Sequence, residues 1–133
     1  VRSELAEPTG RLGWDAGALG IARAAWLVGS LTGDRAALAD AERLGGAAVR
    51  QLLVDPRLVP PWADLLGGVA GVLAGVVCAP LRPGDEGLRG PAVRLLVARL
   101  EELSVEDAAG ARGSMATTTQ PVAGLAHGAS GIE

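Results

Sequence analysis

The chain has no tyrosine, no phenylalanine and no lysine, and only one cysteine and one histidine among its 133 residues. A single cysteine, Cys78, excludes an internal disulfide framework and is compatible with a reducing compartment, so we expect a cytoplasmic location. All twelve basic residues are arginine, the formal net charge is −3, and no basic run occurs. The chain therefore lacks the electrostatic footprint of a nucleic-acid-binding protein.

Long hydrophobic runs are also missing. The longest one, Leu65 to Ala79, covers 79 − 65 + 1 = 15 residues, whereas a membrane-spanning helix needs about 20. This run predicts a buried helix of a globular core, and we expect no membrane partner.

Glycine, by contrast, is abundant, with 20 residues, and it marks a repeat. Three pairs of glycines, each three residues apart, open apolar segments: Gly17 and Gly20, Gly68 and Gly71, Gly128 and Gly131. The copies are separated by 71 − 20 = 51 and 131 − 71 = 60 residues. Such a period suits one helical hairpin per repeat, stacked side by side. Because the third copy has barely begun at Glu133, we expect the chain to be an internal piece of a larger protein with uncovered apolar faces at both ends.

The first predicted hairpin covers about residues 14–54. Asp15 sits where a helix N-cap belongs, and the inner helix Ala16–Leu31 is apolar on nearly all sides, so neighbours should enclose it. Thr32-Gly33-Asp34 supplies a C-terminal glycine and a new N-cap. The outer helix, Arg35–Val54, has one apolar stripe, and its Gly45-Gly46 pair indicates close packing against a neighbour.

The second predicted hairpin covers about residues 64–103. Asp64 precedes the inner helix Leu65–Ala79, and the outer helix follows the Gly84–Gly90 loop, with Pro91 in its first turn and an end near Leu103. Residues 104–133 then form a loop, from about Ser104 to Val122, and the start of a third inner helix. Together these elements predict an all-α fold.

The ordered set of motifs resembles the lanthionine synthetase C-like cyclases, most closely the cyclase domain of type 2 lanthipeptide synthetases. The segments that carry the resemblance are Trp14-Asp15-x-Gly17-x-x-Gly20-Ile21-Ala22, Asp64-Leu65-Leu66-Gly67-Gly68-Val69-Ala70-Gly71 and Gly124-Leu125-Ala126-His127-Gly128-x-x-Gly131-Ile132. The resemblance implies a partial α/α toroid, in which inner helices line a central cavity and their glycine-rich starts surround one mouth. On this reading the chain is a piece of one cyclase domain.

The resemblance also implies a reaction. Family members add cysteine thiols of a precursor peptide to dehydroalanine or dehydrobutyrine, which closes lanthionine and methyllanthionine rings. A zinc ion held by two cysteines and a histidine binds the thiolate in the full-length domain, and those ligands lie downstream of the Ala-His-Gly motif, outside this chain. The resemblance leaves open a dehydratase or kinase domain fused upstream. The chain alone is expected to be inactive and to bind no catalytic zinc.

Two candidate catalytic residues follow from matching the motifs one position at a time. His127 matches the histidine of Ala-His-Gly, which is implicated in proton transfer, and Asp64 matches an acidic active-site position. Independently of the resemblance, imidazole titrates near working pH and suits a reaction that removes one proton and delivers another. Asp64 could also serve only as an N-cap. Cys78 is expected to be a buried small hydrophobe, far from the mouth.

The glycines have two interpretations. Gly68, Gly71, Gly128 and Gly131 could line the cavity, where unpaired N–H groups and the helix dipole would favour a thiolate and an enolate oxygen. Alternatively, the glycines only allow close helix packing. The function also has an alternative, a noncatalytic toroid that binds peptides or a fused partner domain. A toroidal glycosidase is a more distant one, because such enzymes usually need paired carboxylates and aromatic sugar platforms.

Overall fold

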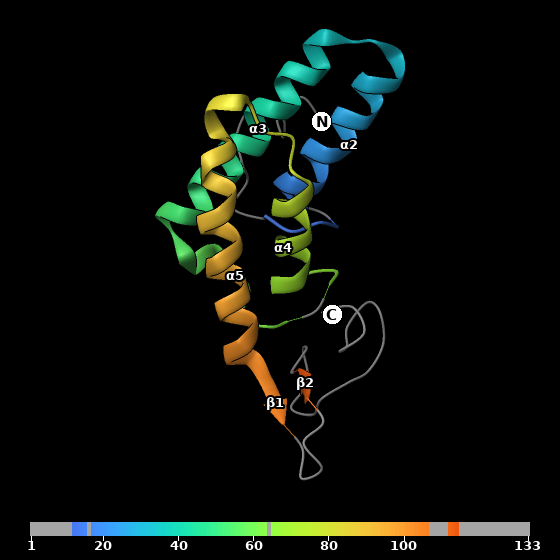
Figure 1. Ribbon diagram of the computed structural model, residues 1–133. Coiled ribbons are helices and arrows are strands. Elements are labelled where there is room, and N and C mark those ends of the chain that lie inside the picture. Colours follow the sequence, from blue (N-terminus) through green and yellow to red (C-terminus); the bar gives the residue numbers. More distant parts are fainter. Residues whose placement is uncertain (1–11, 16, 64, 107–111, 115–133) are drawn as a thin grey trace.

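The computed structural model describes residues 12–15, 17–63, 65–106 and 112–114. This part of the chain is predominantly helical, as the all-α prediction requires, and four α-helices form its body (Figure 1). The only strands among the described residues are two short ones. The third predicted repeat lies outside the described residues.

The first hairpin consists of α2 (Ala18–Thr32) and α3 (Arg35–Val54), which pack along each other. Gly33 adopts φ 72°, a left-handed conformation that favours glycine, and the Asp34 carboxylate accepts a hydrogen bond of 3.1 Å from the N–H of Ala37. The predicted turn and the bounds of the outer helix are thus confirmed.

The start of α2 corrects one prediction. The helix begins at Ala18 with Gly17 as its N-cap, so Asp15 is not the cap and its side chain is exposed. Within this chain, neighbours enclose the N-terminal half of the helix but not its C-terminal half. Leu27, Val28 and Leu31 on that half are exposed to solvent.

The second hairpin consists of α4 (Val69–Cys78) and α5 (Arg89–Leu103). Between the hairpins lies a 3₁₀ turn, η1 (Pro56–Leu58), and a second one, η2 (Pro83–Leu88), connects α4 to α5. Helix α4 is shorter than the predicted range Leu65–Ala79, because a loop occupies its first four residues and Pro80 follows its end. The predicted Gly84–Gly90 loop is largely helical.

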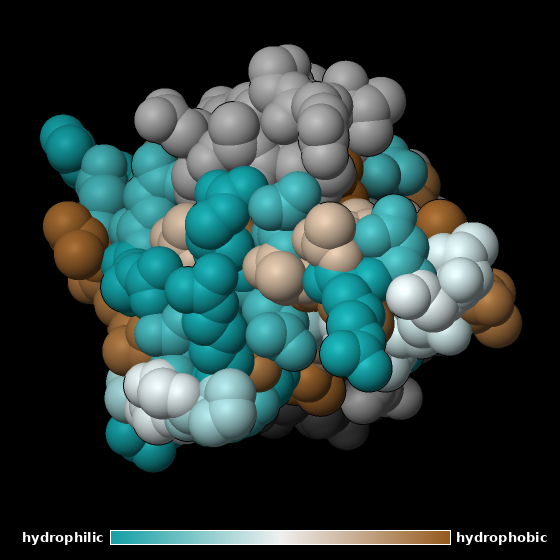
Figure 2. All heavy atoms as spheres, turned by 90° about the horizontal axis from the view of Figure 1, so that it is seen from above, coloured by the Kyte–Doolittle hydropathy of each residue, from teal (hydrophilic) through white to brown (hydrophobic). Residues whose placement is uncertain are grey.

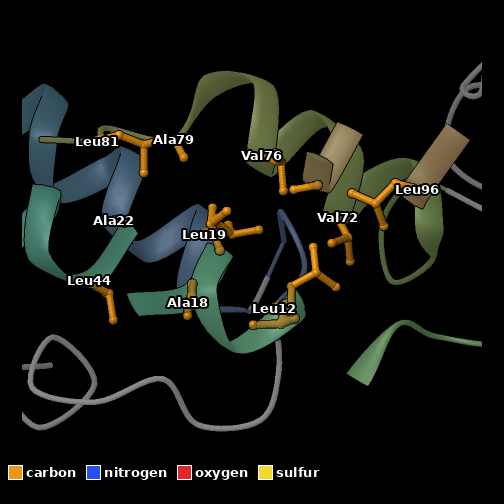
Figure 3. Packing of buried hydrophobic residues seen from close by; sticks show 14 of the residues in the cluster. Leu12, Ala18, Leu19, Ala22, Leu44, Val72, Val76, Ala79, Leu81 and Leu96 are labelled. Carbon is orange, nitrogen blue, oxygen red and sulfur yellow. The ribbon is translucent and has the colours of Figure 1, made fainter. Parts of the chain in front are cut away.

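The two hairpins pack so that their inner helices contact each other and their outer helices contact each other. Helix α2 packs against α4, and α3 packs against α5. Leu19 of α2 lies near the middle of the shared core, with Val72, Val76 and Leu96 of the second hairpin on one side of it (Figure 3). This arrangement matches the predicted stacking of one inner and one outer helix per repeat.

Gly45 of α3 confirms the prediction of close packing. A Cβ atom at this position would collide with the carbonyl oxygen of Pro80, which follows α4. The absence of a side chain therefore lets α3 approach the second hairpin.

The segment after α5 differs from the predicted loop. Strands β1 (Ser104–Glu106) and β2 (Arg112–Ser114) form an antiparallel pair in which Val105 lies opposite Gly113. The sequence does not signal this ribbon, because neither strand shows an extended alternation of apolar and polar residues.

Candidate functional site at the glycine-marked helix starts

The first two Gly-x-x-Gly segments adopt the same backbone course. Gly17 and Gly68 are the N-caps of α2 and α4, and both are extended, with φ −107° and −104°. The N–H of Leu19 donates to the carbonyl of Leu12 over 3.3 Å, and the N–H of Ala70 donates to that of Ala63 over 3.1 Å. Both partners are related by the repeat, since 70 − 19 = 51 and 63 − 12 = 51. The period found in the sequence is therefore a structural repeat.

The second glycine of each pair has a packing role. A Cβ atom on Gly20 would collide with the carbonyl oxygen of Trp14, and one on Gly71 would collide with that of Leu65, where 65 − 14 is again 51. In both copies the loop before the helix crosses over its first turn. Only glycine leaves room for that crossing.

The crossing loop also uses the N–H groups at the helix starts. The N–H groups of Gly17 and Gly20 donate to the carbonyl of Gly13 over 3.1 and 3.4 Å, and the N–H of Val69 donates to that of Trp62 over 2.9 Å. Together with Leu19 and Ala70, these donors are paired within the chain. The hypothesis that such N–H groups are unpaired and open to a substrate is therefore wrong for these five positions, although the positive end of each helix dipole remains there.

The predicted site residues are only partly described by the structure. Gly68 and Gly71 lie buried at the start of α4. His127, Asp64 and the third glycine pair, Gly128 and Gly131, lie outside the described residues. Their predicted roles stay predictions.

Cys78 is the last residue of α4, at the end opposite Gly68, as predicted. Its side chain is partly exposed rather than buried.

In the described ranges no three His, Cys, Asp or Glu side chains are grouped closely enough to hold a metal ion. Among the described helices, none combines the length and apolarity that crossing a membrane requires.

Arg89 binds the C-terminal end of α4, and the sequence analysis did not predict this role. Its guanidinium donates hydrogen bonds to the carbonyls of Val76, Val77 and Ala79 over 2.6, 2.8 and 3.0 Å. These carbonyls lie at the helix end, where intrahelical donors run out and a cation also complements the dipole. The contact joins residues of two different helices, so no local sequence pattern signals it.

Glu86 completes this arrangement. Its carboxylate accepts two hydrogen bonds from Arg89, at 2.9 and 3.1 Å, and these lower the pKa of Glu86 below its ordinary value. In the same loop Asp85 forms an ion pair of 2.6 Å with Arg50 of α3. The loop between α4 and α5 is thus attached to both hairpins by arginine.

No protein-family model matches the chain, and searches of curated proteins and of solved structures likewise gave no match.

Proposed function

We propose that the chain is part of a lanthipeptide cyclase, which closes thioether rings in a dehydrated precursor peptide. The observation that carries the proposal is the common backbone course of the two glycine-marked helix starts, 51 residues apart, on helices that pack against each other. It agrees with the repeat of inner helices that the resemblance implies. A partial α/α toroid is the architecture that goes with this proposal.

The proposed reaction is a Michael-type addition. The sulfur of a peptide cysteine bonds to the β-carbon of dehydroalanine or dehydrobutyrine, and the electrons of the C=C bond move to give an enolate. One proton leaves the thiol and one is added to the α-carbon. In this proposal His127 moves one of these protons, and Asp64 is the acidic residue beside it.

The role of the helix starts in this proposal is limited by their packing. Gly68 and Gly71 would form part of the cavity wall, and the dipole of α4 would favour negative charge at the N-terminal end of this helix. Direct donation by the paired N–H groups is not part of the proposal. Nor does any step run through a metal bound by the described residues.

The test uses the intact protein that carries this chain and a synthetic peptide with one dehydroalanine and one cysteine. Loss of free thiol, followed with a thiol reagent, reports ring closure above the uncatalysed rate. His127→Ala is expected to slow ring closure by about 10²- to 10⁴-fold, the usual size of a general acid–base contribution. Zinc content by atomic absorption should not change, because His127 is not assigned as a ligand.

Arg57→Ala provides the control, since the Arg57 side chain is exposed and pairs only locally with Asp55. It should leave the rate unchanged. If the unsubstituted protein binds the peptide but does not exceed the uncatalysed rate, the cyclase proposal fails and the noncatalytic peptide-binding scaffold replaces it.

A further inference from the structure

The proposed ring closure needs a hydrogen-bond donor that the described helix starts do not supply. When the thiolate adds to dehydroalanine, negative charge develops on the carbonyl oxygen of that residue, and a donor aimed at this oxygen lowers the barrier. The N–H groups of Val69 and Ala70 at the start of α4 already donate to the carbonyls of Trp62 and Ala63. This points to a side chain at the same end of α4.

Trp62 carries the only side-chain N–H or O–H donor among residues 62, 63 and 65–71, the described residues at the start of α4. Its carbonyl accepts the hydrogen bond from Val69 over 2.9 Å, which ties the residue to the first turn of the helix. Its indole nitrogen lies 3.6 Å from the place that a Cβ atom of Gly67 would occupy. No described residue accepts a hydrogen bond from this nitrogen, and Trp62 is only partly buried. The indole N–H is therefore open to a ligand.

Gly67 keeps the approach to this nitrogen free. It is exposed and has no side chain, and the neighbouring Leu66 is 38% exposed. In the third copy of the repeat the residue at the same register is 67 + 60 = 127, which is His127. In the proposed cyclase the imidazole and the space beside the indole therefore occupy equivalent positions, each directly ahead of a helix start.

The surroundings of the indole favour a strong hydrogen bond. Apart from Asp64, no residue from 62 to 71 carries a charge, and an apolar environment strengthens a hydrogen bond to an oxyanion. Seen from above, the side toward which α4 runs, the molecule is by contrast largely hydrophilic (Figures 1 and 2). The start of α4 suits an uncharged, dehydrated peptide segment better than its end does.

We propose that the indole N–H of Trp62 binds the carbonyl oxygen of the dehydroalanine or dehydrobutyrine residue and stabilises the enolate. This inference rests on the cyclase function proposed above. In this step the bond between sulfur and the β-carbon forms, the electrons of the C=C bond move toward the carbonyl oxygen, and they return when the α-carbon is protonated. The indole keeps its own proton throughout, because it acts only as a hydrogen-bond donor.

The test compares the intact protein with its Trp62→Phe variant, using the synthetic peptide with one dehydroalanine and one cysteine. Phenylalanine keeps an aromatic ring at this position but has no N–H group. We expect kcat to fall by about 10²- to 10³-fold, the usual loss for one oxyanion donor, with KM little changed, because the hydrogen bond strengthens only as the enolate forms. The pH profile of kcat should keep its shape, since the indole does not titrate.

Trp26→Phe is the matched control. Trp26 lies within α2, away from the helix starts, and the guanidinium of Arg23 is 5.0 Å from its ring centroid. This variant should keep the kcat of the unsubstituted protein. Thermal unfolding by circular dichroism checks that both variants are folded. If Trp62→Phe is less stable, 3-benzothienylalanine at position 62, which keeps two fused rings without an N–H group, should give the same loss of kcat.

The possible results separate this inference from the function on which it rests. A folded Trp62→Phe variant with an unchanged kcat would overturn the role of the indole and leave the cyclase proposal in place. A loss confined to KM would overturn it as well, since it indicates peptide binding or packing instead of stabilisation of the enolate. An unsubstituted protein that binds the peptide without accelerating ring closure would refute the cyclase function itself.

Discussion

Replacing Gly71 by alanine tests the packing role of the second repeat glycine. The new Cβ would collide with the carbonyl oxygen of Leu65 and would lie 3.1 Å from its carbonyl carbon, so the crossing loop has to move. Overpacking of this kind costs about 1–3 kcal/mol, and a shifted loop also loses part of the hydrogen bond between Ala70 and Ala63, which is worth about 1 kcal/mol. Alanine regains about 1 kcal/mol of helix propensity.

The net loss is therefore about 1–3 kcal/mol, which lowers the melting temperature by roughly 4–12 °C for a chain of this size. Thermal unfolding followed by circular dichroism measures it. Gly20→Ala should behave alike, because Trp14 crosses α2 as Leu65 crosses α4.

Gly87→Ala is the matched control. Gly87 lies in η2 with open space around it and has no positive φ, so alanine should change stability by no more than about 0.5–1 kcal/mol, and in the stabilising direction. Equal stability of the Gly71→Ala variant and the unsubstituted chain would refute the packing role. A loss as large for Gly87→Ala would show that the effect is not specific to the crossing.

Three further predictions concern the ends of the helices. Arg89→Met should destabilise the chain by about 2–4 kcal/mol in urea unfolding, because the carbonyls of Val77 and Ala79 lose the guanidinium donor and that of Val76 keeps only the N–H of Ala79; Arg89→Lys, which keeps the charge but not the planar fork, should recover only part of this. Asp34→Ala should cost about 1 kcal/mol in the same assay, since it removes the N-cap of α3; no loss would contradict the capping role. The pKa of Glu86 is lowered by Arg89, so its contribution is fully present above its unfolded value of about 4.5 and is lost as the pH falls through the lower folded value. Glu86→Gln should flatten this acid dependence of the urea midpoint, and an unchanged pH profile would contradict it.

Local chemistry made the first hairpin largely predictable. The outer helix Arg35–Val54 and its Gly33-Asp34 turn were predicted with the observed bounds, because capping and helical periodicity act within a few residues. The starts of the inner helices were not, because an acidic residue ahead of an apolar run looks like an N-cap. In the structure the glycines are the caps, and the carbonyls that cross them come from a loop whose path depends on tertiary packing.

The site was less predictable than the fold. The 51-residue period located both described helix starts, but it did not reveal that their N–H groups are already paired. An apolar helix surface also does not tell which of its sides is covered, and the exposure of Leu27, Val28 and Leu31 on α2 could not be assigned from the sequence. The arginine at the end of α4 depends on a contact between two helices, and no motif signals such a contact.

The most direct test of the central claim is the separation of Asp64 and His127 in a crystal structure of the intact protein. In the proposed cyclase the carboxylate and the imidazole lie at the mouth of one cavity, within about 10 Å of each other, the spacing of adjacent helix axes. Side chains on opposite outer surfaces, with no shared cavity, would contradict it.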